Sequence, residues 1–327
     1  MDFNKIFIKN AAPTRIGGQA VLEGIMMKGT DRTAVVLRKP NGKLHLRVEP
    51  LKAPSKWMKV PIIRGVVAFV DALVVGTRTL MYSAEVLESF EDEPLEKDKM
   101  TLWLEKRFGE KGAMDAMMYF SVVLAIVFTV GIFIILPTAM VPLFESMTSN
   151  EVALNLIEGA FRIVLFVLYV LAISRMKDIQ RVFEYHGAEH KTIHCFENGL
   201  PLEPKACSQY ETLHPRCGTS FLMFVMVISL ILFSLLGWPD LLTRILSRLL
   251  LIPVVAGLSF ELLRWAGRSD SLTVKILSYP GLLLQKLTTR NPDEKQLEVA
   301  IVAMEAVLDQ GPVETYEREV DPEERFA

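Results

Sequence analysis

Four apolar runs, each long enough to cross a lipid bilayer, constrain this chain more than any other feature of its sequence. A helix needs about 20 residues to cross a hydrocarbon core roughly 30 Å thick. Hydrophobic residues make up 51% of the chain and the mean hydropathy is +0.31, which is high for a soluble chain of 327 residues. The sequence therefore predicts a mainly α-helical, integral membrane bundle. Its expected spans are residues 116–137, 153–175, 219–237 and 246–266.

The distribution of lysine and arginine orients these spans. Residues 138–152, after the first span, contain neither, whereas residues 176–218, after the second, contain several. Because positively charged loops stay in the cytosol, we expect 176–218 on that side. An even number of spans places both termini there too, and the first thirty residues lack the apolar core of a removable signal. We expect a multi-pass protein of the cell membrane, surrounded by membrane lipids, with cytosolic N- and C-termini.

A fifth apolar stretch, residues 60–82, allows two interpretations. Arg64, Asp71 and Arg78 recur every seven residues and therefore fall on one helical stripe. The favoured interpretation is an amphipathic helix that lies at the membrane interface or packs on the bundle. The alternative is a further span or a re-entrant hairpin, which would place the basic segment 1–59 outside, against the distribution of positive charge.

The N-terminal segment predicts a small cytosolic β-element. Residues 44–49 alternate between apolar and polar side chains, and residues 34–37 can pair with them across the turn sequence Pro40–Lys43. An isolated two-stranded ribbon is marginally stable in water. We therefore expect the glycine-rich stretch 17–27 to supply a third strand.

The sequence after the last span predicts amphipathic helices and then a tail. Asn291 can cap a helix that starts at Pro292 and carries Glu294. The apolar face of this helix would be Leu297, Ile301, Met304 and Leu308. The expected parts of the chain are a β-hairpin element (1–59), an interfacial helix and charged linker (60–115), a four-helix transmembrane region (116–266) with a cytosolic histidine-rich loop (176–218), cytosolic amphipathic helices (267–310) and a disordered acidic tail (311–327).

Charge and cysteine content argue against two other classes of protein. A net charge of -2 without a basic face offers no footprint for a phosphate backbone, so nucleic acid is not an expected partner. The three cysteines, Cys195, Cys207 and Cys217, are odd in number and accompany histidines. That pattern indicates free thiols in a reducing compartment and not a disulfide framework.

The segment after the second span contains His-x-x-Glu-His, the reverse of the His-Glu-x-x-His motif of zinc proteases. Four residues apart, His186 and His190 lie on one face of a helix, and Glu189 is placed to take a proton from metal-bound water. His194 continues the same stripe one turn further, but its angular drift makes it a poorer ligand.

A second pair of donors lies just before the third span. His214 and Cys217 are three residues apart, at the same expected membrane face as the first pair. The sequence thus predicts a metal site, with zinc preferred, formed by His186, His190, His214 and Cys217. The alternative is a polar juxtamembrane helix in which a spacing of four arises by chance. Cys195 and Cys207 lack ligand-like spacings and are left out of the predicted site.

Several ionisable residues lie inside the expected spans. Glu158 and Arg162, four residues apart, predict a self-neutralising pair that faces the bundle interior. Glu261 lies near the cytosolic end of the last span, where it either joins the site or pairs with Arg264 or Arg268. Three more residues could fold back onto the histidines: Glu23, Arg64 and Asp71.

Three strings of residues carry a family resemblance: Gly18–Gly24 (GQAVLEG), His186–Thr192 (HGAEHKT) and His214–Ser220 (HPRCGTS). Shorter matches follow at Pro280–Leu282 and Leu287–Arg290. Together they resemble the YqhQ-like family of bacterial membrane proteins, over nearly the whole chain. The resemblance implies a multi-pass protein with a domain of unknown function that is sometimes labelled a predicted metal-dependent enzyme.

Two hypotheses of different classes follow. In the first, the chain is a membrane-bound zinc-dependent hydrolase: three histidines hold the metal, Glu189 is the general base, and Cys217 is a fourth ligand or a neighbour. Its substrates would be lipids or membrane-protein segments at the cytosolic face. In the second, a structural metal or a histidine cluster staples the cytosolic loop to residues 18–27 of a non-catalytic scaffold or assembly factor with a membrane-protein partner. Four protein ligands in a closed site would indicate the second.

Overall fold

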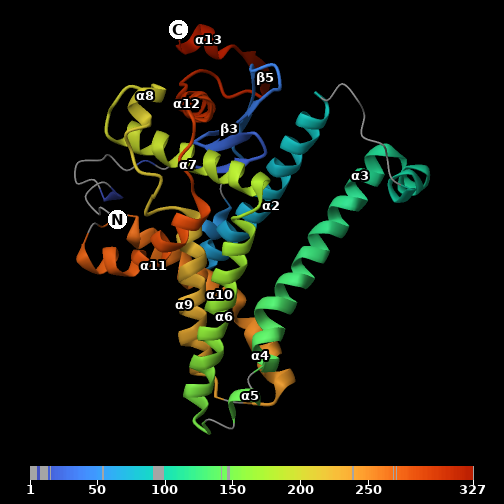
Figure 1. Cartoon of the computed structure of the whole chain (residues 1–327), viewed down its shortest axis with the longest axis vertical. Coiled ribbons are helices and arrows are strands. Elements are labelled where there is room, and N and C mark those ends of the chain that lie inside the picture. The colour runs from blue at the N-terminus through green and yellow to red at the C-terminus, as the bar shows by residue number, and fades with distance from the viewer. Residues whose placement is uncertain are drawn as a thin grey trace. The chain divides into compact units, whose positions relative to one another are not determined.

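The structure is a computed structural model of the whole chain (Figure 1). It describes residues 6–7, 14, 16–53, 55–90, 99–140, 142–145, 148–237, 239–267, 269 and 271–326. The chain divides into two compact units. Unit 1 comprises Met1–Phe90, Val167–Ile228 and Ile252–Ala327, and unit 2 comprises Glu91–Phe166 and Ser229–Leu251.

Unit 1 contains an antiparallel sheet in which the strands lie side by side in chain order. They are β1 (Gly17–Val21), β2 (Gly24–Lys28), β3 (Arg32–Arg38), β4 (Leu44–Pro50) and β5 (Tyr316–Val320). The predicted hairpin is confirmed as β3 and β4, with Leu37 opposite His45. The stretch expected to add one strand forms two, β1 and β2, because the chain reverses at Glu23, where φ is +49°.

The C-terminal segment differs from its prediction. Residues 311–327 are expected to be disordered, but β5 pairs with β4 along its length and helix α13 (Pro322–Phe326) follows. The acidic side chains are paired with distant basic ones: Lys39 Nζ lies 2.7 Å from Glu319 Oε2. A composition argument misses this strand because the opposite charges that stabilise it come from the other end of the chain.

The described helices that lie wholly within unit 1 are η1 (Lys56–Lys59), α2 (Ile63–Glu88), α7 (Lys177–Glu197), α8 (Pro204–Cys207), α11 (Leu272–Thr288), α12 (Glu294–Leu308) and α13. One face of the sheet, with Leu44, Leu46 and Val48, packs against α7 and α12 in the main hydrophobic core. The opposite face, with Val35 and Leu37, packs against α2. Figure 1 shows α2 along one side of the sheet and α7 and α12 along the other. The alternation predicted for residues 44–49 is confirmed.

The last long helix, α12, begins two residues later than predicted. Its cap is Asp293 instead of Asn291. The Asp293 carboxylate accepts a hydrogen bond from the Gln296 amide at 2.8 Å, and the Gln296 side chain accepts one from the Asp293 amide at 2.9 Å. This reciprocal capping box fixes the start of the helix. Three of the four predicted core positions, Leu297, Ile301 and Met304, are fully buried.

Four described helices are long and apolar enough to cross a membrane: Ile63–Glu88, Tyr119–Met140, Glu151–Ile173 and Leu241–Ala266. The last three correspond to expected spans, whereas the expected span 219–237 is a shorter apolar helix. Between Lys99 and Ala266 the described helices other than α7 and α8 are α3 (Lys99–Val130, interrupted at Gly109), the π-helix η2 (Gly131–Ile135), α4 (Leu136–Met140), α5 (Pro142–Glu145), α6 (Glu151–Ile173), α9 (Gly218–Ser234) and α10 (Leu241–Ala266).

Helix α2 has the length of a span, but its second half packs on the sheet. Val75, Tyr82 and Val86 contact the face that carries Val35 and Leu37. The turns before Val75 comprise about 12 residues, or roughly 18 Å of helix. That is shorter than a hydrocarbon core. The packing therefore favours the interpretation of a helix packed on its neighbours over that of a complete span.

Unit 2 contains a buried network of charges. Arg162 Nη2 lies 2.9 Å from Glu158 Oε1, as predicted from their spacing. Arg248 of α10 also binds the Glu158 carboxylate and reaches Asn155 Oδ1 at 3.1 Å. All four side chains are buried. The expected pair is thus part of a network in which two guanidinium groups share one carboxylate.

Candidate metal centre

Helix α7 contacts β1, β2, α8 and α12, and most polar residues of its second half, from Glu189 to Glu197, are buried. The close approach requires a glycine at one point. A Cβ at Gly187 would overlap the carbonyl oxygen of Arg290, in the segment between α11 and α12. The adjacent His186 is thereby held against the end of α11. Because buried polar groups need partners, each side chain of this stripe can be assigned a role from its contacts.

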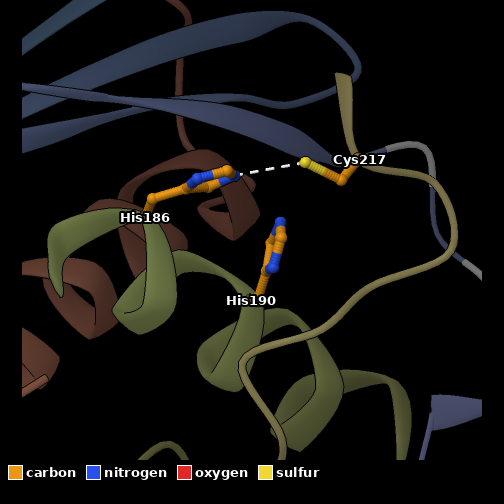
Figure 2. Close-up of side chains that lie close together, drawn as sticks. All are labelled: His186, His190 and Cys217. Atoms are coloured by element: carbon orange, nitrogen blue, oxygen red, sulfur yellow. Dashed lines mark hydrogen bonds between the residues drawn. The ribbon is translucent and has the colours of Figure 1, made fainter. Parts of the chain in front are cut away.

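Two of the predicted donors on α7 meet one from the start of α9. The ring nitrogen Nε2 of His186 lies 3.2 Å from the sulfur of Cys217. Ligand atoms of His186, His190 and Cys217 all lie within 4.8 Å of one another, the one such group of three among the described residues. Figure 2 shows both imidazole rings extending from α7 toward the Cys217 sulfur. We call His186, His190 and Cys217 the ligand trio.

Backbone carbonyls fix the orientation of both trio histidines. Nδ1 of His186 lies 2.8 Å from the Thr288 oxygen, and Nδ1 of His190 lies 2.5 Å from the Thr212 oxygen. A carbonyl oxygen only accepts, so each Nδ1 must carry the proton. In the neutral ring the lone pair is then on Nε2, the atom that faces Cys217. Histidines that bind metals are usually oriented by such a second hydrogen bond.

Cys217 immediately precedes the first residue of α9. Its sulfur lies 3.2 Å from Thr219 Oγ1 and accepts a hydrogen bond from the Thr219 amide at 3.4 Å. Burial opposes ionisation of the thiol, but the adjacent His190 and the Thr219 hydrogen bonds outweigh it and lower the pKa of Cys217. Burial also lowers the pKa of His190 to about 4, so its ring is neutral near pH 7. Both pKa shifts are in the direction that favours metal binding, because a metal binds the thiolate and the neutral imidazole.

Glu189 is buried beside the trio and under strand β1. A Cβ at Gly18 would stand 3.0 Å from the Glu189 Cδ atom, so glycine is needed for this close approach. Burial raises the pKa of the Glu189 carboxyl to about 7, although the nearby His186 and the Gly18 amide favour its charged form. A carboxyl with a pKa near neutrality can both accept and release a proton.

The structure does not bring His214 into the trio. Its ring centroid is 5.5 Å from that of His190, and its Nδ1 accepts the Arg216 amide at 3.3 Å. Nε2 of His214 faces Glu197 at 4.0 Å. Burial lowers the pKa of His214 to about 3. This histidine therefore belongs to a neighbouring polar cluster with Glu197 and Arg216.

The other polar residues of α7 bind backbone. Nε2 of His194 donates to the Leu213 carbonyl at 2.9 Å. Lys191 donates to the carbonyl oxygens of Ser208 and Tyr210 at 2.8 and 2.6 Å. These contacts hold the segment after α8 against α7. Cys195 and Cys207, left out of the predicted site, contact one another away from the trio, and all three cysteines are free thiols.

The residues that could have folded back onto the histidines have other partners. Glu23 pairs with Arg181, with 2.6 Å between Nη2 and Oε2. Asp71 lies 2.9 Å from Lys28 Nζ. Glu261 binds Arg64 of α2, with 2.6 Å between Oε1 and Nε, and does not join the trio.

Sequence reasoning missed the residues that position the trio. Gln285 of α11 binds the His214 backbone twice, accepting from its amide at 2.8 Å and donating to its carbonyl at 2.9 Å. Thr288, on the same helix, supplies the carbonyl that orients His186. No spacing rule connects α11 with the histidine motif, because the contacts form only in three dimensions. The family resemblance at the strings around Gly281 and Leu287 was the one sequence signal that pointed to α11.

The donor set suits zinc. Two imidazole nitrogens and a thiolate are ligands that Zn²⁺ prefers, and three protein ligands leave a fourth position for water or substrate. Tetrahedral zinc with ordinary bond lengths holds such ligand atoms about 3.4–3.6 Å apart. In the trio, His186 Nε2 lies 3.2 Å from the Cys217 sulfur, and all three ligand atoms lie within 4.8 Å of one another. Small side-chain movements would therefore bring them to the distances that zinc requires.

A cleft of about 440 Å³ is lined in part by the segments that orient the histidines. Its lining includes Thr212, Thr289, Glu211, Lys286 and Arg290. It therefore reaches the backbone that holds His190.

Comparisons with known proteins place the chain. Residues 60–310 match the family model described as "Protein of unknown function (DUF1385)". The chain is 35% identical over 310 residues to the "Uncharacterized protein YqhQ" of Bacillus subtilis (strain 168), covering 92% of this chain and 94% of that relative. No solved structure matches it. The chain therefore belongs to the DUF1385 family, whose function is unknown.

Proposed function

We propose that this chain is an integral membrane protein with a zinc-dependent hydrolase site at its cytosolic face. The observation that carries the proposal is the convergence of His186 Nε2, His190 and the Cys217 sulfur, while both Nδ1 atoms are already engaged by backbone carbonyls. Histidines whose second ring nitrogen already has a hydrogen-bond partner are typical of metal ligands. The proposed ligand set differs from the predicted set of four in leaving out His214 and keeping His186, His190 and Cys217.

The membrane part of the proposal rests on length, composition and charge. The helices Tyr119–Met140, Glu151–Ile173 and Leu241–Ala266 are each long enough to cross, and α9 is the fourth span. The lack of lysine and arginine in residues 138–152 puts that loop outside. The start of α9, and with it Cys217, is then cytosolic. Four spans keep both termini on the same side.

Glu189 supplies the acid–base chemistry. Zinc held by three protein ligands would act as a Lewis acid and lower the pKa of a coordinated water. Glu189 lies one residue before His190 on α7, in electrostatic contact with His186 and Cys217. Its carboxylate takes the proton of the attacking water and returns it to the leaving group. At a cytosolic membrane face the substrate is a lipid or a segment of a membrane protein.

Metal content of the detergent-purified protein, measured by mass spectrometry, tests the ligand set. We expect about one zinc per chain in the wild type and in His214→Ala, and loss of zinc in Cys217→Ser and in the double variant His186→Ala, His190→Ala. A folded wild type that takes up no zinc when reloaded would refute the site. Loss of zinc in His214→Ala as well would establish four ligands and a closed, structural metal.

The general-base role has a separate test. Glu189→Gln keeps the size of the side chain but cannot accept a proton. We expect it to retain zinc and to fail to complement the phenotype of a strain that lacks the protein. If Glu189→Gln keeps both its zinc and full complementation, the hydrolase proposal is wrong.

The second candidate is a non-catalytic membrane scaffold or assembly factor. The contacts that favour it are those of Lys191 and His194, which bind the backbone of residues 208–213 as a staple. In this case the trio only strengthens the attachment of the loop to α7. The two candidates differ in the Glu189→Gln result, because a scaffold would tolerate that change.

A further inference from the structure

Helix α11 carries an apolar stripe that faces away from the protein. Leu272, Ile276 and Leu283 are 73%, 63% and 43% exposed. Their spacing of four and seven residues puts them on one face of the helix. The exposed Lys286 lies beyond the end of the stripe. A large apolar stripe on a helix surface indicates an interaction site.

The opposite face of α11 is fixed, so the stripe cannot turn inward. Val274 and Leu282 are fully buried in a cluster with Phe224 of α9. A Cβ at Gly281 would stand 2.9 Å from Ser220 Cα, and Gln285 donates to Ser220 Oγ at 2.9 Å. The helix is therefore attached to the first turn of α9. Figure 1 shows it running across the direction of α9.

A second exposed feature lies in η1, shortly before α2 begins. Trp57, in η1, is 60% exposed and stands between Lys56 and Lys59. The chain from η1 into α2 is packed on α10, where a Cβ at Gly257 would stand 2.7 Å from the Ile62 carbonyl oxygen. Tryptophan flanked by lysine is typical of the membrane–water interface, where the ring lies among the headgroups and the amines reach the phosphates.

We propose that Trp57, Leu272, Ile276 and Leu283, here called the surface collar, contact the headgroup region of the lipid bilayer. Two independent elements support this occupant. The collar adjoins the start of α9 and the last turns of α10, which are the ends of two apolar helices on the same side. An amphipathic helix that follows a span and runs across its direction lies in the interface plane. The lysines match anionic headgroups.

Helix α11 connects the surface collar with the ligand trio. The residues of α11 that position the site come just after Leu283 in the sequence. Gln285 forms two hydrogen bonds with the His214 backbone, and the Thr288 carbonyl orients His186. One helix therefore contacts lipid with one face and holds the loop and the histidine with the other. The trio is thus placed within a few turns of helix of the bilayer surface.

Spin labels on single introduced cysteines test the collar in full-length protein. The sites are Ile276→Cys and Leu283→Cys on the collar and Leu200→Cys in the turn after α7. Leu200 is a matched control, because it is also a leucine with 43% of its surface exposed. The protein is reconstituted in vesicles of phosphatidylethanolamine and phosphatidylglycerol. Electron paramagnetic resonance then compares collisions with oxygen, which enriches in lipid, and with a water-soluble nickel chelate.

We expect the two collar labels to collide several-fold more with oxygen than with the nickel chelate, and the Leu200 label to show the reverse. Equal access of the chelate to collar and control labels would overturn the proposal. So would dipolar broadening at Ile276 that disappears when labelled protein is diluted with unlabelled protein, because a second copy would then cover the stripe. The readout does not depend on zinc, so its failure is distinguishable from that of the hydrolase.

Discussion

The backbone of Gly18 lies directly against the carboxylate of Glu189, so that a Cβ added to the glycine would stand 3.0 Å from Cδ and 3.1 Å from Oε1. The Gly18 backbone amide also favours the charged form of this carboxylate. Strand β1 thus covers the buried side of the candidate site. The contact joins the string GQAVLEG to the string HGAEHKT, although about 170 residues separate them.

Replacing Gly18 with alanine should destabilise the protein. The added methyl would meet the Met26 carbonyl oxygen at 2.6 Å as well as the Glu189 carboxyl. Because a strand backbone cannot move aside cheaply, we expect a loss of about 1–3 kcal/mol, seen as a lower Tm in detergent. Gly17→Ala is the control, since its Cβ would meet nothing within 4 Å. Equal Tm values for the two variants would contradict the close approach.

Gln285→Leu should loosen the loop that carries His214 and Cys217. The change leaves both the amide and the carbonyl of His214 without their buried partner, at about 1–3 kcal/mol for each unsatisfied group. Hydrogen exchange followed by mass spectrometry should show faster exchange in the peptide that covers residues 212–217. The exposed Gln209→Leu, earlier in the same loop, should leave that exchange unchanged. Wild-type protection in Gln285→Leu would exclude the positioning role.

Local patterns predicted the parts of the fold that depend on local forces. The alternation of residues 44–49 predicted the buried face of β4, and the apolar runs predicted three long helices. The strand β5 was missed because its pairing partner, β4, lies at the other end of the chain. Asp293 was passed over as a cap because Asn291 before a proline satisfies the same local rule.

The candidate site was predicted where spacing determines geometry and missed where packing does. A spacing of four puts His186 and His190 on one face, and both turn toward Cys217. His214 is three residues from Cys217, but the Gln285 contacts and the Arg216 amide turn its ring toward Glu197. The spacing of two loop residues does not determine which of them faces a helix.

Glu158→Gln should be among the most destabilising changes in unit 2. Arg162 and Arg248 both bind this carboxylate in a buried site. Removing its charge leaves two buried guanidinium groups without a counterion, at about 3–5 kcal/mol. Adding Arg248→Met should recover part of the loss of Tm. Glu261→Gln, which breaks a partly exposed pair with Arg64, is the control, with an expected effect of about 0–1 kcal/mol. Similar losses for both glutamates would show that the network contributes no more than a surface pair.

Glu197 should make stability depend on pH. Its carboxylate accepts hydrogen bonds from the Thr14 amide at 2.7 Å and the Thr14 hydroxyl at 2.9 Å, and it pairs with Arg216. Although burial favours the neutral acid, the nearby His214 ring and the hydrogen bond from Arg216 lower the pKa of Glu197 to about 2.

A carboxyl whose pKa is lower in the folded state stabilises the fold above its ordinary pKa of 4.5, and this stabilisation is lost as the pH falls from there toward 2. Glu197→Gln should therefore lower the Tm near neutral pH, and the difference from the wild type should shrink at about pH 3. Thermal unfolding across this range measures it, with the exposed Glu203→Gln as a control that changes little at any pH. A Tm difference that stays constant from neutral pH to about pH 3 would mean that the Glu197 charge does not stabilise the fold.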